Sequence, residues 1–406
     1  MTMETTLKPT LFGYGLTTKA IAKSLGGGCT FFDDNAKEAY TDENNNQILP
    51  SHLFDPENSK LEVTTPSVPP AHPLIKSAKN LMSEYDFFAK EMPFSIWISG
   101  TNGKTTTTQM LTYLLEEKGA VSGGNIGTPL AELDTKVPIW VLESSSFTLH
   151  HTNVASPDIY LLLPITPDHL DWHGTPEQYE ADKLKPLLTM KEGELALLPK
   201  GLNLPKTDAF VVEYDSAEFL ANYFDIDASK IRFKAAFLED ALVALAVTKT
   251  LFDEIDYDRI NAFTLDNHRQ EETSDTLGRL WVNDSKATNL DATVQAVKTY
   301  DDRFIRLIIG GNDKGADLEP LFRLLQTKEV KLYSIGANSE KLANLANKYD
   351  VDFIACETLE NAIKTIYNER TENDVALLSP AAASFDQFNS YKHRGEEFFR
   401  IIKSIR

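Results

Sequence analysis

The chain of 406 residues contains only two cysteines, Cys29 and Cys356, which lie far apart in the sequence. Two scattered thiols cannot build a zinc cluster or a disulfide framework, and such sparse use of cysteine fits a reducing compartment. The chain also lacks an apolar run long enough to span a bilayer, and residues 1–9 contain no apolar segment typical of a secretory signal. We therefore expect a cytoplasmic protein without membrane insertion.

Basic residues are fewer than acidic ones. Lys and Arg together number 40 against 60 Asp and Glu, which gives a formal net charge of −20. Because nucleic acids require a basic surface, we expect no nucleic-acid partner. The acidic excess can serve solubility alone. An acidic protein that does bind an anionic ligand must use helix termini, metal ions and a few placed cations, so local motifs indicate the site.

The most informative motif is Ser-Gly-Thr-Asn-Gly-Lys-Thr-Thr-Thr at residues 99–107. It follows Phe94–Ile98, which predicts a buried parallel strand, and it precedes residues 109–118, which predict a helix ended by Gly119. In such a loop, backbone N–H groups and a helix N-terminus face a phosphate, the lysine adds a charge and a hydroxyl reaches Mg²⁺. A full GxxxxGK[ST] motif would need glycine at Ile98, and a chance Gly-Lys-Thr in an ordinary loop is the alternative.

Length predicts two or three domains, and an alternating strand and helix pattern divides the chain into three α/β sections. We place them at residues 1–92, 93–264 and 265–406. The first section predicts a strand at 10–12, a glycine turn and a helix at 16–25, followed by a second strand that ends at Asp33 and Asp34. This pattern is half of a dinucleotide-binding fingerprint, and its third glycine is missing. The alternative is a tight turn that binds no ligand.

In the second section, strands predicted at 139–142 and 159–163 lead into Glu143 and into Asp168-His169. Ligands gather at the carboxyl ends of parallel strands. The Glu143 carboxylate can hold Mg²⁺ there, although a solvated surface acid would have the same sequence. His169 could bind a second ion or a substrate carboxylate, or be a histidine with no ligand.

Residues 175–178, Thr-Pro-Glu-Gln, predict the start of a helix that carries Tyr179 and Lys183. On the sequence alone, Lys183 is a solvated helix lysine. Residues 191–230 show no regular pattern.

The third section predicts strands at 304–309, 330–335 and 375–378 and a helix at 290–300. Three polar or glycine-rich segments follow apolar runs, and together they predict a ligand site at one sheet edge, although each alone could be a loop cap. They are Asn283–Asn289, Gly310–Gly315 and Ser379–Phe385.

As a set, these motifs resemble the Mur ligases in order along nearly the whole chain. The matching segments are GTNGKTTT, NIGTP at 125–129, ESSSF from Glu143, DHLDWHG from Asp168, YEADK ending at Lys183, HR at 268–269, NDSKATN, GGNDKGAD and SPAAASFDQF. NDSKATN and SPAAASFDQF are most similar to the D-glutamate-adding members of the family.

The resemblance implies three α/β domains: an N-terminal Rossmann-like domain, a central P-loop ATPase domain and a C-terminal Rossmann-like domain. It also implies an ATP-dependent amide ligase, acting through an acyl phosphate on UDP-N-acetylmuramoyl-L-alanine and D-glutamate in peptidoglycan precursor synthesis. We expect a monomer that uses ATP and two Mg²⁺ ions.

The resemblance further implies the site residues. Those implied for ATP are Gly100, Thr101, Asn102, Gly103, Lys104, Thr105, Thr106, Arg269 and Asp284. Those implied for the metal ions are Thr105 and Glu143 on one ion and His169 on the other, with Lys183 as a carbamate; Lys104, Glu143, His169 and Lys183 are implied as catalytic. Those implied for substrates are Leu16, Thr17, Asp33 and Asp34 for UDP, Asn125 and His169 for the sugar-peptide end, and Lys286, Thr288, Lys314, Ser384 and Phe385 for D-glutamate.

Three positions depart from the family pattern. Residues 236–240 replace a His-Asn pair and a later Asn that contact adenine. The segment Asp33-Asp34-Asn35 lacks a basic residue seen in some relatives, and Tyr391 replaces a common Phe. Two other functions stay open: a P-loop NTPase switch or motor, which leaves the three segments of the last section unexplained, and a dinucleotide-dependent oxidoreductase, which the missing glycine disfavours.

Overall fold

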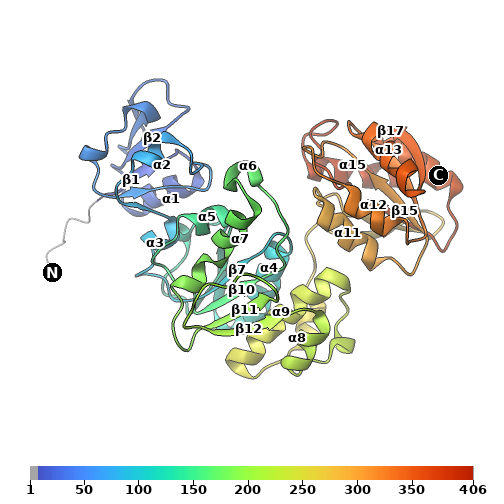
Figure 1. Ribbon diagram of the computed structural model, residues 1–406, viewed down its shortest axis with the longest axis horizontal. Helices are drawn as coiled ribbons and strands as arrows, with labels where there is room; N and C mark the ends of the chain where they lie inside the picture. The colour runs from blue at the N-terminus through green and yellow to red at the C-terminus, as the bar shows by residue number, and fades with distance from the viewer. Residues whose placement is uncertain (1–7, 406) are drawn as a thin grey trace. The chain divides into compact units, whose positions relative to one another are not determined.

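The computed structural model describes residues 8–405; residues 1–7, at the start of the first predicted domain, and residue 406 lie outside the described part. The described chain is mixed α/β, with three six-stranded sheets of mostly parallel strands (Figure 1). It divides into two compact units. One contains the first two sheets and comprises the described residues up to Phe233 with Phe237–Phe263; the other contains Lys234–Ala236 and the described residues from Thr264 onward.

The first sheet has the order β3-β4-β2-β1-β5-β6 and is parallel except for β3. Its strands are β1 Thr10–Phe12, β2 Thr30–Asp33, β3 Tyr40–Thr41, β4 Gln47–Pro50, β5 Glu62–Val63 and β6 Leu81–Met82. Its helices are α1 Leu16–Ser24, α2 Pro73–Ser77 and α3 Glu84–Phe87. The predicted glycine turn lies between β1 and α1, and the Tyr14 N–H donates to the Asp33 carboxylate at 2.7 Å, which ties the turn to the end of β2.

The second sheet is parallel throughout, in the order β12-β11-β10-β7-β9-β8. Its strands are β7 Phe94–Ser99, β8 Ala120–Gly124, β9 Ile139–Glu143, β10 Ile159–Leu162, β11 Leu195–Pro199 and β12 Phe210–Tyr214. Its helices are α4 Lys104–Leu115, α5 Ser146–His150, α6 Leu170–His173, α7 Pro176–Leu184, α8 Ala217–Tyr223, α9 Ala235–Phe252 and α10 Tyr257–Ala262. Trp97 and Trp140 are fully buried in this sheet.

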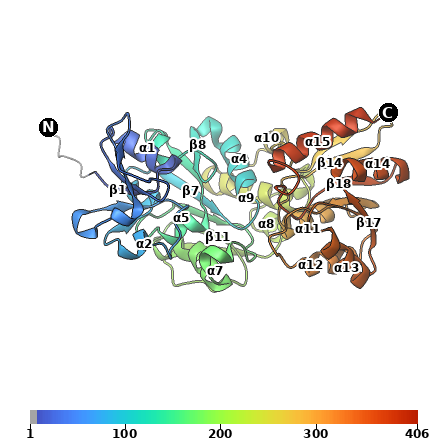
Figure 2. The same ribbon diagram turned by 90° about the horizontal axis from the view of Figure 1, so that it is seen from above.

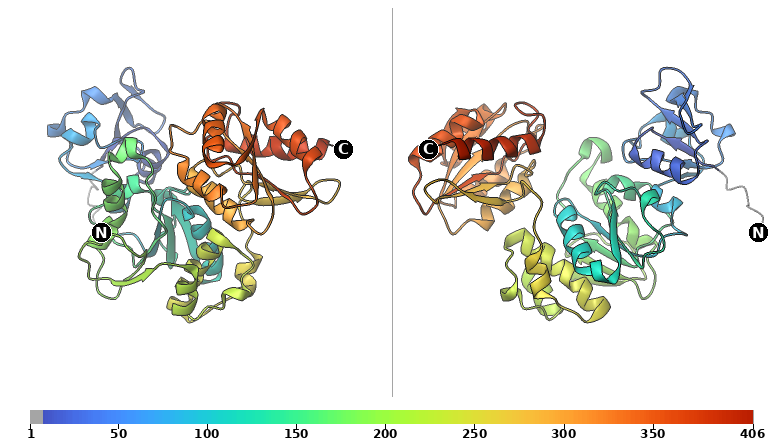
Figure 3. Two further views of the ribbon diagram at one scale, coloured as in Figure 1. Left: turned by 45° about the vertical axis from the view of Figure 1, so that its right-hand side comes forward. Right: turned by 180° about the vertical axis from the view of Figure 1, so that it is seen from behind.

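Helices cover both faces of the second sheet. Figure 2 shows α4 and α9 on one side and α5 and α7 on the other. Helices α8, α9 and α10, yellow-green in Figure 3, lie together after the last strand of the sheet. This arrangement buries the apolar strands on both faces, as a parallel sheet requires.

The helix after the phosphate loop begins at Lys104, five residues before the predicted start at 109, and its α-helical part ends at Leu115. The run of β-branched threonines at 105–108 has low helix propensity, so the sequence pattern placed the start too late. Packing overrides that propensity, because Thr106, Thr107 and Thr108 are buried. A short 3-10 turn then leads to Gly119, whose φ of 79° ends the helix as predicted.

The third sheet has the order β13-β14-β18-β15-β16-β17 and is parallel except for β13. Its strands are β13 Glu271–Ser274, β14 Leu280–Asn283, β15 Ile305–Ile309, β16 Val330–Ile335, β17 Asp352–Glu357 and β18 Val375–Leu378. Its helices are α11 Leu290–Thr299, α12 Glu319–Leu325, α13 Ser339–Tyr349, α14 Leu359–Glu369 and α15 Tyr391–Ser404. Figure 2 shows α14 and α15 on one face and α11, α12 and α13 on the other, and an apolar core fills each layer.

The three polar segments of the last section follow β14, β15 and β18, which are mutually parallel. They therefore leave the sheet at one carboxyl edge, as predicted. None of the helices in residues 8–405 is long and apolar enough to cross a membrane.

Candidate active site

The phosphate loop joins β7 to α4 and is held in place by backbone carbonyls. The Lys104 Nζ donates to the carbonyls of Gly100 and Thr101 at 2.9 and 2.8 Å. The Thr101 hydroxyl donates to the Thr166 carbonyl at 2.9 Å, and the Thr166 N–H returns a bond to that hydroxyl. The loop is thus fixed to the segment that follows β10, and the first turn of α4 presents its N–H groups beyond Gly103.

Two glycines of the loop are required by their conformation and surroundings. Gly100 has a φ of 142°, and a Cβ there would lie 2.6 Å from the Leu163 Cβ. Gly103 has a φ of 82°, and a Cβ there would lie 2.6 Å from a carboxylate oxygen of Asp240. Larger residues would distort the backbone at both positions. The predicted loop therefore has the tight geometry that a phosphate cradle needs.

Glu143 ends β9 beside the loop and is almost fully buried, so the surface-acid interpretation is wrong. One carboxylate oxygen accepts a 2.6 Å bond from the Asn125 amide. The other, Oε2, is buried and has no hydrogen-bond partner among the described residues. Burying a carboxylate oxygen without a partner is costly, which makes this atom a candidate metal ligand.

Lys183 differs most from the prediction that its own sequence context gave, which was a solvated helix lysine. Its side chain is 1% exposed, so it is not a solvated helix lysine. Its Nζ donates to the Gly100 carbonyl at 2.8 Å and lies 4.7 Å from the centre of the Tyr179 ring. Burial, and then the charge of Lys104, hold the pKa of Lys183 well below its usual range. Lys183 thus contacts the phosphate loop itself.

His169 lies beyond the end of β10, at the N-cap of α6, rather than on the strand end itself. Its backbone is left-handed, with a φ of 53°, and its side chain is 49% exposed. The ring packs against Phe147 at 4.9 Å, and Nε2 lies 3.5 Å from the Asp168 carboxylate. An exposed imidazole of this kind is accessible to a ligand.

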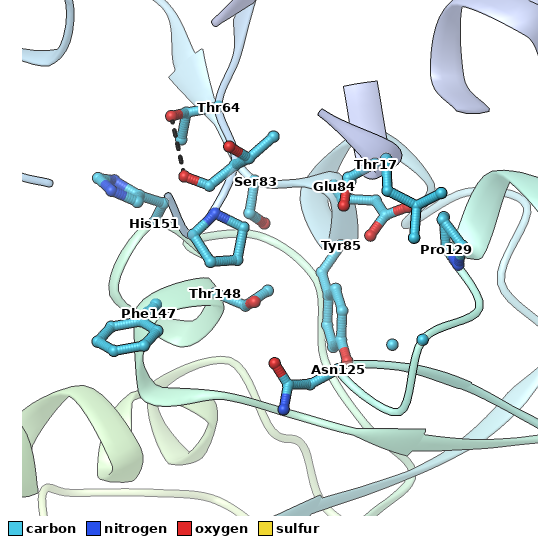
Figure 4. Close-up of a pocket in the computed structure, with 15 residues that line it drawn as sticks. Thr17, Thr64, Ser83, Glu84, Tyr85, Asn125, Pro129, Phe147, Thr148 and His151 are labelled. Carbon is cyan, nitrogen blue, oxygen red and sulfur yellow. Dashed lines mark hydrogen bonds between the residues drawn. The ribbon is translucent and has the colours of Figure 1, made fainter. Parts of the chain in front are cut away.

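A cavity of about 180 Å³ lies next to Asn125, within the first compact unit (Figure 4). Predicted substrate residues Leu16, Thr17 and Asn125 line it, as do unpredicted ones that include Glu84, Phe147 and His151. His151 is 6% exposed, and its Nε2 has no hydrogen-bond partner among the described residues. Burial lowers the pKa of His151 to about 3, so the ring is neutral.

Glu84 in this cavity makes the stability of the protein depend on pH. Its carboxylate accepts the Leu130 N–H at 2.8 Å, and burial raises its pKa from 4.5 to about 7. Between these values the folded protein keeps a proton that the unfolded chain has released, so stability falls as pH rises, by up to about 3 kcal/mol.

We therefore expect Glu84→Gln, which cannot ionise, to gain stability relative to the unsubstituted protein as pH rises through this window. Urea unfolding at both ends of the window measures the difference, with the exposed Glu43→Gln as control. A difference that does not change with pH would contradict this assignment.

In the second compact unit, Asp284 lies at the exit of β14 and is buried. Its carboxylate accepts the Ser379 hydroxyl at 2.8 Å and the Gln270 N–H at 3.3 Å, and burial raises its pKa to about 7. Arg269 precedes Gln270 and contributes a favourable charge to Asp284. The two predicted ATP residues Arg269 and Asp284 thus interact electrostatically at the exit of β14.

Arg394 of α15 ties two of the predicted ligand segments together, and sequence reasoning missed it. Its guanidinium is buried and donates to the Ser285 hydroxyl and carbonyl, both at 2.9 Å, and to the Ala382 carbonyl at 3.2 Å. Within the first of these segments, the Lys286 Nζ lies 4.3 Å from the centre of the Tyr391 ring. A buried guanidinium with these carbonyl acceptors fixes both loops.

The remaining predicted residues differ in exposure. Ser384 is buried, whereas Phe385 is 72% exposed and Thr288 and Lys314 are exposed. In the first sheet, the Asp34 carboxylate bonds Ser51 and His72.

Sequence comparison identifies relatives over nearly the whole chain. Residues 98–203 match the Mur ligase middle domain, and residues 268–382 match the Mur ligase glutamate ligase domain. A UDP-N-acetylmuramoylalanine–D-glutamate ligase of Campylobacter jejuni is 49% identical over 402 residues, covering 98% of this chain and 100% of that protein. The enzyme of the same name from Helicobacter pylori is 44% identical, with coverages of 98% and 99%.

Solved structures show the same fold at low identity. The MurF ligase of Thermotoga maritima, in complex with ADP, aligns with a TM-score of 0.56 and 14% identity over 93% of this chain and 94% of that one. MurC from the same organism aligns with a TM-score of 0.56 and 15% identity, with coverages of 97% and 98%. With relatives this similar over almost their full length, the chain belongs to the Mur ligase family.

Proposed function

We propose that this protein is the ATP-dependent ligase that joins D-glutamate to UDP-N-acetylmuramoyl-L-alanine in cytoplasmic peptidoglycan precursor synthesis. The observation that carries the proposal is the buried contact of Lys183 with the phosphate loop, together with the unpartnered oxygen of Glu143 at the end of the neighbouring strand β9. Relatives of 49% and 44% identity that are named for this reaction support it. The NTPase-switch alternative has no such support.

The proposal includes three domains at residues 1–92, 93–264 and 265–406, with Rossmann-like folds in the first and third and an ATPase fold in the second. The protein is a monomer in this proposal. The three separate sheets agree with this division.

In the reaction, an oxygen of the alanyl carboxylate attacks the γ-phosphorus of ATP, and ADP leaves. The amine of D-glutamate then attacks the resulting acyl phosphate, loses a proton, and phosphate leaves as the amide forms. Phosphoryl transfer needs positioning and charge neutralisation more than covalent help from the protein. Lys104 and the first turn of α4 supply both to the phosphates, together with Gly100, Thr101, Asn102, Gly103, Thr105 and Thr106.

The residues beside the loop suit two Mg²⁺ ions, which would neutralise charge on the transferring phosphoryl group. Thr105 and Glu143 would hold one ion and His169 the other, with Lys183 as a further ligand. The buried and unpartnered Oε2 of Glu143 fits this role, because Mg²⁺ prefers carboxylate oxygen ligands.

A carbamate at Lys183 is consistent with the surroundings of the side chain. Burial favours the neutral amine, and the neutral amine is the form that adds CO₂. The carbamate nitrogen keeps one hydrogen, which can still donate to the Gly100 carbonyl. The modification also places an anion that can bind metal close to Lys104.

The substrate contacts complete the proposal. Arg269 and Asp284 contact ATP, and Asn125 and His169 contact the sugar-peptide end. D-glutamate is held by Lys286, Thr288, Lys314, Ser384 and Phe385, and UDP by Leu16, Thr17, Asp33 and Asp34.

Phosphate release tests the function directly. We expect the protein to release phosphate from ATP with UDP-N-acetylmuramoyl-L-alanine only when D-glutamate is added, with L-glutamate as the control. Release that is indifferent to D-glutamate would contradict the ligase and favour the NTPase. A nicotinamide absorbance change would favour the oxidoreductase.

A further inference from the structure

We propose that His150, His173 and Asp182 form a binding site for one divalent transition metal ion of the Zn²⁺ or Co²⁺ type. The three residues come from α5, α6 and α7, and their ligand atoms all lie within 4.8 Å of one another. None of them is among the predicted ligands of Mg²⁺.

The spacing of the donor atoms suits a metal ion. The His150 Nδ1 lies 2.9 Å from both oxygens of Asp182, and the His173 Nδ1 lies 2.7 Å from one of them. Ligand atoms bound at about 2.0–2.2 Å to one tetrahedral zinc ion sit about 3.3–3.6 Å apart, which is only slightly wider than the spacing seen here. Small side-chain rotations are therefore enough to aim the three donors at a common ion.

Outer hydrogen bonds would orient two of the ligands. The His173 Nε2 lies 3.0 Å from the Ser146 hydroxyl. When Nδ1 binds metal, Nε2 carries the ring proton and can donate a hydrogen bond to that hydroxyl. The Gln178 amide donates to the Asp182 Oδ1 at 2.9 Å, which leaves Oδ2 directed at the two histidines. Such outer partners fix the tautomer and the orientation of metal ligands.

The burial and solvent accessibility of the three side chains also suit a metal site. The side chains of His173 and Asp182 are 0% and 4% exposed, and that of His150 is 24% exposed. The rings of Trp172 and Phe147 lie 4.5 and 5.4 Å from that of His173. The carboxylate is thus shielded from water by aromatic groups, while His150 gives an ion a route from solvent.

The donor set selects the class of ion. Two imidazoles with one carboxylate suit Zn²⁺, Co²⁺ and related ions, whereas Mg²⁺ prefers oxygen ligands alone. The ion's charge would offset that of the buried Asp182, whose carboxylate otherwise has only hydrogen-bond partners such as the Gln178 amide and the two imidazoles. Mg²⁺ at the phosphate loop and a transition metal here can therefore be separated experimentally.

The test uses the full-length protein, freed of metal with a chelator and then held in excess Mg²⁺. Co²⁺ is titrated and followed by its visible absorption, and Zn²⁺ is then added to displace it. We expect one equivalent of Co²⁺ to bind. His150→Gln and Asp182→Asn should each weaken this binding at least about 100-fold, since loss of an outer partner alone costs about 10–100-fold.

Two controls locate the ion. His52→Gln removes an exposed histidine elsewhere in the same unit and should bind Co²⁺ unchanged. Glu143→Gln alters the predicted Mg²⁺ site and should also bind unchanged. Circular dichroism checks the fold of each variant, and the partly exposed His150 keeps the test available if Asp182→Asn misfolds.

Three results would overturn the proposal. They are no stoichiometric binding by the unsubstituted protein, equal affinity in folded His150→Gln, and binding that Glu143→Gln abolishes while His150→Gln retains it. The first two would mean that the cluster is a hydrogen-bond network alone, and the third would place the ion at the phosphate loop.

Discussion

Replacing Lys104 with alanine is expected to lower kcat for phosphate release by about 10³-fold or more, while the affinity for UDP-N-acetylmuramoyl-L-alanine changes little. Removal of one well-placed electrostatic group commonly costs about 10²–10³-fold, and cationic groups on a transferring phosphoryl reach about 10³–10⁵-fold. The Lys104 side chain lies on the loop at the start of α4, whereas the cavity beside Asn125 is lined by other residues. Chemistry and substrate binding should therefore separate.

The measurement pairs phosphate release with calorimetric binding of the UDP substrate. Lys104→Met keeps the methylene stem and tests whether loss of charge alone is enough. Lys118→Ala, at the other end of the same helical segment, removes a surface ion pair with Glu254 and should remain active. A kcat within tenfold of the unsubstituted enzyme would rule out the assigned role, and loss of substrate binding as well would indicate misfolding.

Lys183→Ala is expected to lose most of its activity, by about 10²-fold or more, and to regain part of it when short carboxylates such as formate or acetate are added. The substitution removes the donor to the Gly100 carbonyl and opens a cavity where the side chain is 1% exposed. A small carboxylate that enters this space restores the negative charge of the proposed carbamate, although not its attachment to α7.

Rescue distinguishes this role from a structural one. Added carboxylate should raise the activity of Lys183→Ala but not that of Lys104→Ala, and Lys183→Arg, which cannot form a carbamate, should stay inactive. Lys191→Ala, at an exposed position, is the matched surface control. A fully active Lys183→Ala enzyme would show that the carbamate assignment is wrong.

Strands with sharp apolar boundaries were predictable from the sequence. The structure matches the predicted bounds at 330–335 and 375–378, because these runs are mostly buried and end at Gly336 and at Ser379-Pro380. β11 and β12 were missed, and β12 lies at a sheet edge, where Phe210 and Glu213 are exposed. An edge strand has only a partial apolar pattern for a sequence to display.

The sequence motifs of the site could be predicted, but the contacts between residues distant in sequence could not. The order of the motifs indicated the phosphate loop and Glu143, but the burial of Lys183 depends on how α7 packs against the loop. Asp240 shows the same limit. It belongs to none of the sequence motifs, yet its carboxylate accepts a hydrogen bond from the Thr107 hydroxyl at 3.0 Å, 133 residues away in sequence. Asp240 also lies beside Gly103 and belongs to the segment 236–240 that departs from the family pattern.

The placement of the tryptophans gives this protein a built-in optical probe. Three of its four indoles, Trp97, Trp140 and Trp281, are sealed inside sheets with 0% exposure, so their emission should vary little with ligands. Trp172 instead lies 5.1 and 4.5 Å from the rings of His150 and His173. Because imidazolium and many metal ions quench indole fluorescence, the difference between the spectra of the unsubstituted protein and Trp172→Phe would report on this neighbourhood without any attached dye.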